Sequence, residues 1–169
     1  QCLGMALLAT VVDPQRANRT LPDPIVLVED PALLASLDTG DAALYQEVAV
    51  VQSPENWDRF RRAAFPGLRL ADGEAMARLA AQYALPEYTD AQLDGFDRPV
   101  LIVAGRQDAI VGFEDQWALA RRFTTCTFAA LDHAGHNVHL DQPSLVRALL
   151  ADWAARASES SRHLPRGRG

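Results

Sequence analysis

The chain has 169 residues, of which 49% are hydrophobic and 22% are charged, a balance typical of a globular domain with a real core. The formal net charge of −6 argues against nucleic acid as a partner. Cys2 and Cys126 are far apart and form no C-x-x-C spacing, so we expect no disulfide framework. No apolar run reaches the roughly 18 residues that a membrane span needs, and we expect a cytoplasmic protein without a membrane partner.

The first predicted element is a strand over residues 2–12, a continuous apolar run that Asp13 and Pro14 end. Such a run fits a strand of a parallel sheet that is buried on both faces, and a buried helix is the alternative. The chain begins inside this run without an initiating Met, although first residues usually lie outside a core. We therefore expect a fragment of a longer protein. Residues 13–24 hold three prolines and indicate an irregular connection.

A block of helical patterns follows, over residues 31–38, 41–51, 53–65 and 71–85. In the third pattern Ser53 is the expected N-cap and Pro54 occupies the first helical position. In the fourth, Asp72 is the expected N-cap, and one apolar face carries Met76, Leu79, Ala80 and Tyr83.

The last part of the chain alternates strands and helices. Strands are predicted within residues 98–108 and 126–132, and helices over residues 112–123 and 142–157. This order implies right-handed crossovers and a parallel sheet, so the predicted fold class is α/β. We expect residues 158–169 to be a disordered tail, because they have little apolar content.

Two candidate catalytic residues follow the two strands of this last part. Asp108 ends the stretch Gly105-Arg106-Gln107-Asp108, and His136 lies in Asp132-His133-Ala134-Gly135-His136. Functional groups gather at the carboxyl ends of strands in open α/β sheets. A carboxylate beside an imidazole there is what a general-base histidine requires. The alternatives are a turn-capping Asp108 and a structural His136.

The stretches that contain Asp108 and His136 resemble part of a known protein family. The stretches "PVLIVAGRQDAIVG" and "LDHAGHNVHLDQP", followed by an amphipathic helix, resemble the C-terminal part of the α/β-hydrolase family, closely from Arg98 to about Arg156. The resemblance implies that Asp108 is the triad acid and His136 the base. It also implies a partial α/β-hydrolase sheet of about three parallel strands, with flanking helices and a helical cap insertion. The implied divisions are residues 1–23 (core strand and connection), 24–95 (cap), 96–157 (C-terminal core) and 158–169 (tail).

The sequence lacks two parts of that family's active site, the serine nucleophile and the usual oxyanion-hole loop after an early strand. The family carries its serine nucleophile on a G-x-S-x-G elbow, and no such motif occurs here. The chain thus resembles roughly the last three-fifths of a hydrolase. We expect it to be inactive alone and to depend on the N-terminal remainder of the same protein or on self-association. The expected reaction is hydrolysis of an ester, acyl or carbon–carbon bond in a small-molecule substrate, without a cofactor. The alternative is a non-catalytic ligand-binding or interaction module on the same scaffold.

Three further expectations concern side chains near the proposed site. Trp57 and Phe60 are candidates to bind substrate, and the alternative is that they form the core of the cap. His133, His136 and His139 with two aspartates offer enough ligands for zinc. Residues three apart converge only on a helix, however, so we expect no metal site. His133 is then expected to pack at the strand end and His139 to face the cap or solvent.

Overall fold

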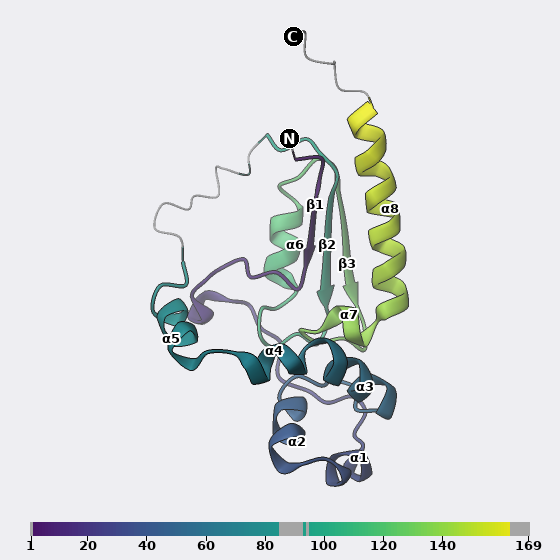
Figure 1. Ribbon diagram of the computed structural model, residues 1–169. Helices are drawn as coiled ribbons and strands as arrows, with labels where there is room; N and C mark the ends of the chain where they lie inside the picture. Colours follow the sequence, from purple (N-terminus) through teal and green to yellow (C-terminus); the bar gives the residue numbers. More distant parts are fainter. Residues whose placement is uncertain (1, 85–92, 94, 163–169) are drawn as a thin grey trace.

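The computed structural model describes residues 2–84, 93 and 95–162 (Figure 1). Its strands are β1 (Met5–Leu8), β2 (Val100–Gly105) and β3 (Cys126–Leu131). Its α-helices are α1 (Pro31–Ser36), α2 (Thr39–Gln46), α3 (Pro54–Ala63), α4 (Phe65–Leu70), α5 (Gly73–Ala81), α6 (Glu114–Ala120), α7 (Val138–Asp141) and α8 (Pro143–Arg162). A short 3-10 helix, η1, spans Arg16–Asn18.

The three strands form one parallel sheet in the order β1-β2-β3. The central strand β2 is buried along its whole length. Leu101 and Val103 face α8, and Val100 and Ile102 face the side of α6, because successive side chains of a strand point to opposite faces. The two helices accordingly lie on opposite sides of the sheet (Figure 1). The predicted parallel α/β sheet is confirmed.

The first strand is shorter than predicted. β1 spans Met5–Leu8, not residues 2–12, and its side chains are only half-buried because it is an edge strand among the described residues. The expectation of burial on both faces was therefore wrong. The strand ends because Ala9 has a φ of +44°, in the left-handed region where strand backbone cannot continue.

The helices α1 to α4 and their connections lie beyond the carboxyl ends of β2 and β3 (Figure 1), and we call this part the cap below as a label of its position only. The predicted N-caps are confirmed: Ser53 Oγ accepts from Asn56 N at 3.1 Å, and Asp72 Oδ1 accepts from Ala75 N at 2.8 Å. The predicted helix over residues 41–51 ends early, at Gln46. The β-branched valines after it favour extended backbone, and Val51 forms a parallel bridge with Val28.

The C-terminal helix is longer than predicted. α8 continues to Arg162, so the expectation of disorder was wrong for residues 158–162, and residues 163–169 lie outside the described part. No glycine or proline interrupts the helix there, and Ser158 Oγ donates to Ala154 O within it. None of the described helices is long and apolar enough to cross a membrane. Cys2 and Cys126 are both free thiols.

Candidate active site

The carboxylate of Asp108 is positioned by the turn that follows β2. Asp108 N donates to Gly105 O at 3.2 Å, and the side chain is fully buried. Its Oδ1 accepts from Ile110 N at 2.9 Å and from Val111 N at 3.1 Å. One carboxylate oxygen thus caps the turn, as the alternative interpretation supposed, and the other oxygen remains for a second partner.

That second partner is His136, from the loop that follows β3. His136 Nδ1 lies 3.1 Å from Asp108 Oδ2, and about a third of the imidazole side chain (34%) is exposed. A carboxylate can only accept hydrogen bonds, so Nδ1 carries the proton and donates it, which leaves Nε2 as the acceptor nitrogen of the neutral ring. The structure therefore brings together the two residues that the sequence singled out.

Two glycines allow the loops of Asp108 and His136 to approach. A Cβ atom on Gly105 would lie 2.1 Å from Gly135 O and 2.5 Å from Ala134 O, and a Cβ on Gly135 would lie 2.7 Å from Val50 Cγ2. Neither glycine has a positive φ, and the left-handed residue of the loop of His136 is His133, at +54°. Their function is close backbone approach.

Gln107 joins the same two loops. Its backbone N donates to Ala134 O at 2.9 Å, and its side-chain Oε1 accepts from Ala134 N at 3.2 Å. Its Nε2 donates to Asp132 Oδ1 at 2.8 Å, and this bond is the largest cause of a lowered pKa of Asp132. Sequence reasoning missed this glutamine, although its place directly before Asp108 was a usable signal.

Two cavities adjoin the imidazole of His136. The first, of about 160 Å³, lies between the loops of the site and the cap, and its wall is largely apolar, with Ile25, Val48 and Ile110 among its lining residues. The second, of about 450 Å³, lies beside the carboxyl end of β1, where Leu8 and Ala9 line it. His136 therefore lies at the boundary between a pocket under the cap and a space beside the open edge of the sheet.

The neighbouring histidines do not join His136 in a metal site. His133 Nδ1 lies 3.0 Å from Asp132 Oδ2, and both side chains are largely exposed. His139 is exposed on α7 and lines the second cavity, where partial desolvation of its ring lowers its pKa. Within the described ranges, no three His, Cys, Asp or Glu side chains are grouped as a metal ion requires.

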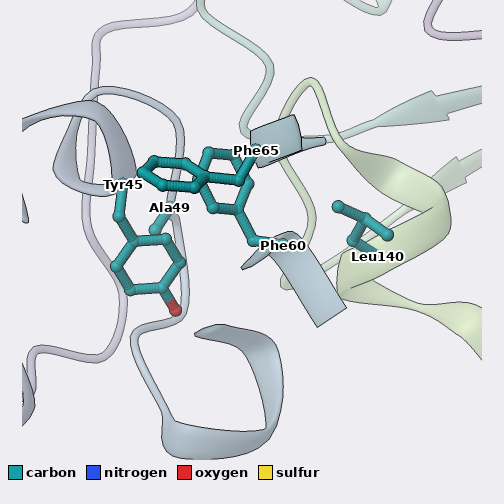
Figure 2. Close-up of a cluster of buried hydrophobic side chains, with 5 residues drawn as sticks. All are labelled: Tyr45, Ala49, Phe60, Phe65 and Leu140. Atoms are coloured by element: carbon teal, nitrogen blue, oxygen red, sulfur yellow. The ribbon is translucent and has the colours of Figure 1, made fainter. Parts of the chain in front are cut away.

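Trp57 and Phe60 lie in the core of the cap. Phe60 is only 2% exposed and belongs to a cluster that also contains Tyr45, Ala49, Phe65 and Leu140 (Figure 2). Trp57 packs against this cluster, with its ring 5.2 Å from that of Tyr45. Neither residue lines either cavity beside His136. The structure therefore favours the alternative for these side chains, a cap core, over contact with substrate.

The polar residues Asn56 and Asp141 were also missed as parts of the site. Asp141 Oδ2 accepts from Gly135 N at 2.9 Å, and its Oδ1 accepts from Asn56 Nδ2 at 2.8 Å. In the sequence, Asp141 stood out only as one of the two aspartates beside the three histidines. No sequence pattern placed Asn56, since its partner lies 85 residues away.

The fold and the paired strand-end loops define a partial α/β-hydrolase fold. The structure superposes on the crystal structure of an α/β superfamily hydrolase from Oenococcus oeni PSU-1 with a TM-score of 0.81 at 19% sequence identity, covering 92% of this chain and 58% of that chain. The fold predicted from the sequence is thereby confirmed.

Two curated relatives carry the same name, "Putative carbamate hydrolase RutD". The protein from Pseudomonas syringae pv. syringae is 29% identical over 63% of this chain and 43% of its own length. The protein from Pseudomonas savastanoi pv. phaseolicola is 28% identical over 69% of this chain and 47% of its own length. The chain thus spans less than half the length of these relatives. No protein-family model matches the sequence.

Proposed function

We propose that this chain is the part of a serine-type α/β hydrolase that supplies the acid and the base of the catalytic triad. The observation that carries the proposal is the hydrogen bond between buried Asp108 and partly exposed His136, whose ring borders two cavities at the carboxyl ends of the strands. Similarity to hydrolases supports the reaction class.

In the proposed mechanism, a serine hydroxyl attacks the carbonyl carbon of the substrate while its proton passes to Nε2 of His136. Asp108 holds the ring in the required tautomer and stabilises the imidazolium. The imidazolium then returns the proton to the leaving group as the tetrahedral intermediate collapses to an acyl-enzyme. A water molecule then attacks the acyl-enzyme in the same way, with His136 taking and returning its proton, and this step releases the carboxylic acid and frees the serine. This chemistry requires no cofactor.

The serine is proposed to come from outside this chain. The serines at positions 36, 53 and 158 bond to backbone groups of their own helices. The second cavity adjoins His136 at the end of β1, an edge strand within the described residues. The N-terminal remainder of the same protein would extend the sheet at this edge and bring the nucleophile into that cavity, and self-association is the alternative source of the missing part. We propose that the complete protein is cytoplasmic.

The cavity under the cap is the proposed site for the acyl group of the substrate. Its volume of about 160 Å³ is small beside the ~300–1,000 Å³ of most ligand pockets. Its largely apolar wall suits a short acyl group of an ester or a related acyl compound. The proposal thus favours short-chain over long-chain substrates.

A fluorogenic ester assay on the full-length protein tests the proposal. Short-chain esters should be hydrolysed, and His136→Ala should lower kcat/KM by about 10⁴-fold or more. His133→Asn is the matched control, because His133 is exposed and asparagine tolerates its left-handed backbone; it should leave the rate unchanged. Activity that survives His136→Ala would overturn the proposed role of His136, and a parent protein without any activity would favour the non-catalytic ligand-binding or interaction module.

A further inference from the structure

The side chain of Asp141 joins two separate parts of the molecule. It ends the short helix α7, and both of its oxygens accept a hydrogen bond. Oδ2 accepts from the backbone N of Gly135, directly before His136 in the sequence, at 2.9 Å. Oδ1 accepts from Nδ2 of Asn56, on the cap helix α3, at 2.8 Å.

The chain of hydrogen bonds continues into the cap. Asn56 is 4% exposed and Tyr45 is 1% exposed. The hydroxyl of Tyr45 donates to Asn56 Oδ1 at 3.0 Å, which leaves the amide Nδ2 facing Asp141. Among the described residues, no buried side-chain nitrogen or oxygen lacks a hydrogen-bond partner. A fully satisfied network of this kind specifies one arrangement of the segments that it joins.

Two further contacts hold the cap against the loop of His136 and against the helix α7 that follows it. A Cβ on Gly135 would lie 3.4 Å from Val48 O as well as against Val50, so the connection between α2 and α3 lies directly on this glycine. In addition, Arg59 Nε of α3 donates to Leu140 O of α7 at 2.6 Å, which ties the cap to the helix that carries Asp141. The backbone of Gly135 is therefore enclosed between the cap and α7.

We propose that Asp141 and Asn56 are positioning residues that fix the loop of His136 and register it with the cap. That the position of His136 matters for catalysis rests on the proposed function; that Asp141 and Asn56 fix this position does not. A carboxylate is needed at position 141 because both of its oxygens accept, from Gly135 and from Asn56, whereas an amide has a single acceptor oxygen. The charged carboxylate costs free energy at this position. Burial raises the pKa of Asp141, although the hydrogen bonds from Gly135 and Asn56 act to lower it.

An exchange of the two side chains tests the inference. Asn56→Asp alone places a second carboxylate against Asp141, and at pH 8 the two must repel or hold a proton at a cost. Asn56→Asp combined with Asp141→Asn restores all three hydrogen bonds, and only the bond between positions 56 and 141 has its donor and acceptor exchanged. The carboxylate introduced at position 56 accepts from Tyr45 and from the new amide at position 141, and the oxygen of that amide accepts from Gly135 N.

The readouts are the hydrogen exchange of the Gly135 amide and the Nδ1 proton resonance of His136, followed by NMR in the full-length protein. We expect Asn56→Asp to speed Gly135 exchange by about tenfold or more and to broaden or move the His136 signal. The exchanged pair should restore both. Phe65→Leu is the control: it loosens the neighbouring aromatic cluster and lowers stability, but should leave the His136 signal in place.

The result that overturns the inference is an Asn56→Asp protein with unchanged Gly135 exchange and His136 signal, or an exchanged pair that restores neither. If Asn56→Asp does not fold, the exchanged pair still decides by whether it recovers both signals. These readouts require no turnover, so they separate this inference from the proposed hydrolase activity. In an active protein, Asn56→Asp should lower kcat more than it changes KM, and the exchanged pair should recover kcat.

Discussion

Asp108 and His136 are 28 residues apart in the chain, and Oδ2 of the carboxylate lies 3.1 Å from Nδ1 of the imidazole. Their contact depends on two neighbouring parallel strands that end at the same edge of the sheet. It also depends on the close backbone approach of the two loops, which places Gly105 against Ala134 and Gly135.

Replacement of Gly105 by alanine should therefore damage the site through the backbone. The new Cβ would lie 2.1 Å from a carbonyl oxygen, and no side-chain rotation can relieve that contact. We expect Gly105→Ala to lower the free energy of unfolding by about 3 kcal/mol, measured by urea denaturation. Gly67→Ala is the control, because nothing lies within 4 Å of its Cβ position, and alanine in helix α4 should add ~0.5–1 kcal/mol. Equal effects of the two changes would contradict the close-approach argument.

Replacement of Asp108 by asparagine should change the tautomer of His136. The amide oxygen can still accept from the backbone of residues 110 and 111, but the amide nitrogen then faces Nδ1 and favours a proton on Nε2 instead. We expect the imidazole ¹⁵N shifts to report this exchange of protonated nitrogen. Asp152→Asn, at an exposed carboxylate paired with Arg156, should leave those shifts unchanged. An Asp108→Asn protein with the same tautomer as the parent would argue against the pairing.

Asp141 should give the stability a characteristic pH dependence. Burial raises its pKa above the ordinary 3.8, so the folded state binds the proton more tightly than the unfolded state. The stability it contributes is present below pH 3.8 and is lost as the pH rises through the folded pKa. We therefore expect the unfolding free energy of the parent, relative to Asp141→Asn, to fall as the pH rises above 3.8 and then level off.

Asp132 should give the unfolding free energy the opposite dependence on pH. The hydrogen bond from Gln107 lowers its pKa below 3.8, so its contribution is present above that pH and is lost as the pH falls through the folded pKa. Relative to Asp132→Asn, the parent should lose stability towards low pH. Slopes of the same sign for the two variants would show that the environment of Asp141 differs from the one described.

The aromatic cluster of the cap should behave as a core. Phe60 is 2% exposed (Figure 2), and Phe60→Ala should cost about 3–5 kcal/mol of unfolding free energy. Leu70→Ala, at a residue that is 85% exposed, should stay within about 0.5 kcal/mol. A Phe60→Ala protein of unchanged stability would reopen a direct role of this side chain in binding.

Sequence reasoning predicted the parallel sheet, the flanking helices and the Asp108–His136 pair, because these follow from local apolar patterns and from short motifs at strand ends. It did not predict where strand β1 ends, since the positive φ of Ala9 has no signature in an alanine. It also left open whether Asp108 caps its turn or orients the histidine. The structure shows that one oxygen does the first and that the other contacts His136.

The parts that the sequence missed are contacts between distant segments. Asn56 contacts Asp141 across 85 residues. Trp57 and Phe60 contact each other and Tyr45, and they line neither cavity beside His136. Such contacts depend on how α3 docks on α7, which no periodicity encodes. The close backbone approach at Gly105 and Gly135 was also visible only in the structure, because a glycine in a sequence does not show whether it serves a close approach or a turn.

The most direct test of the proposed Asp108–His136 unit is a double-mutant cycle on ester hydrolysis by the protein with its proposed N-terminal part, with Asp108→Asn, His136→Ala and both changes together. Residues that act as one catalytic unit are strongly non-additive. We predict that kcat/KM of the double variant equals that of His136→Ala alone, because Asp108 acts only through the histidine. Losses of kcat/KM that multiply, or full activity without His136, would show that Asp108 and His136 do not act as one catalytic unit.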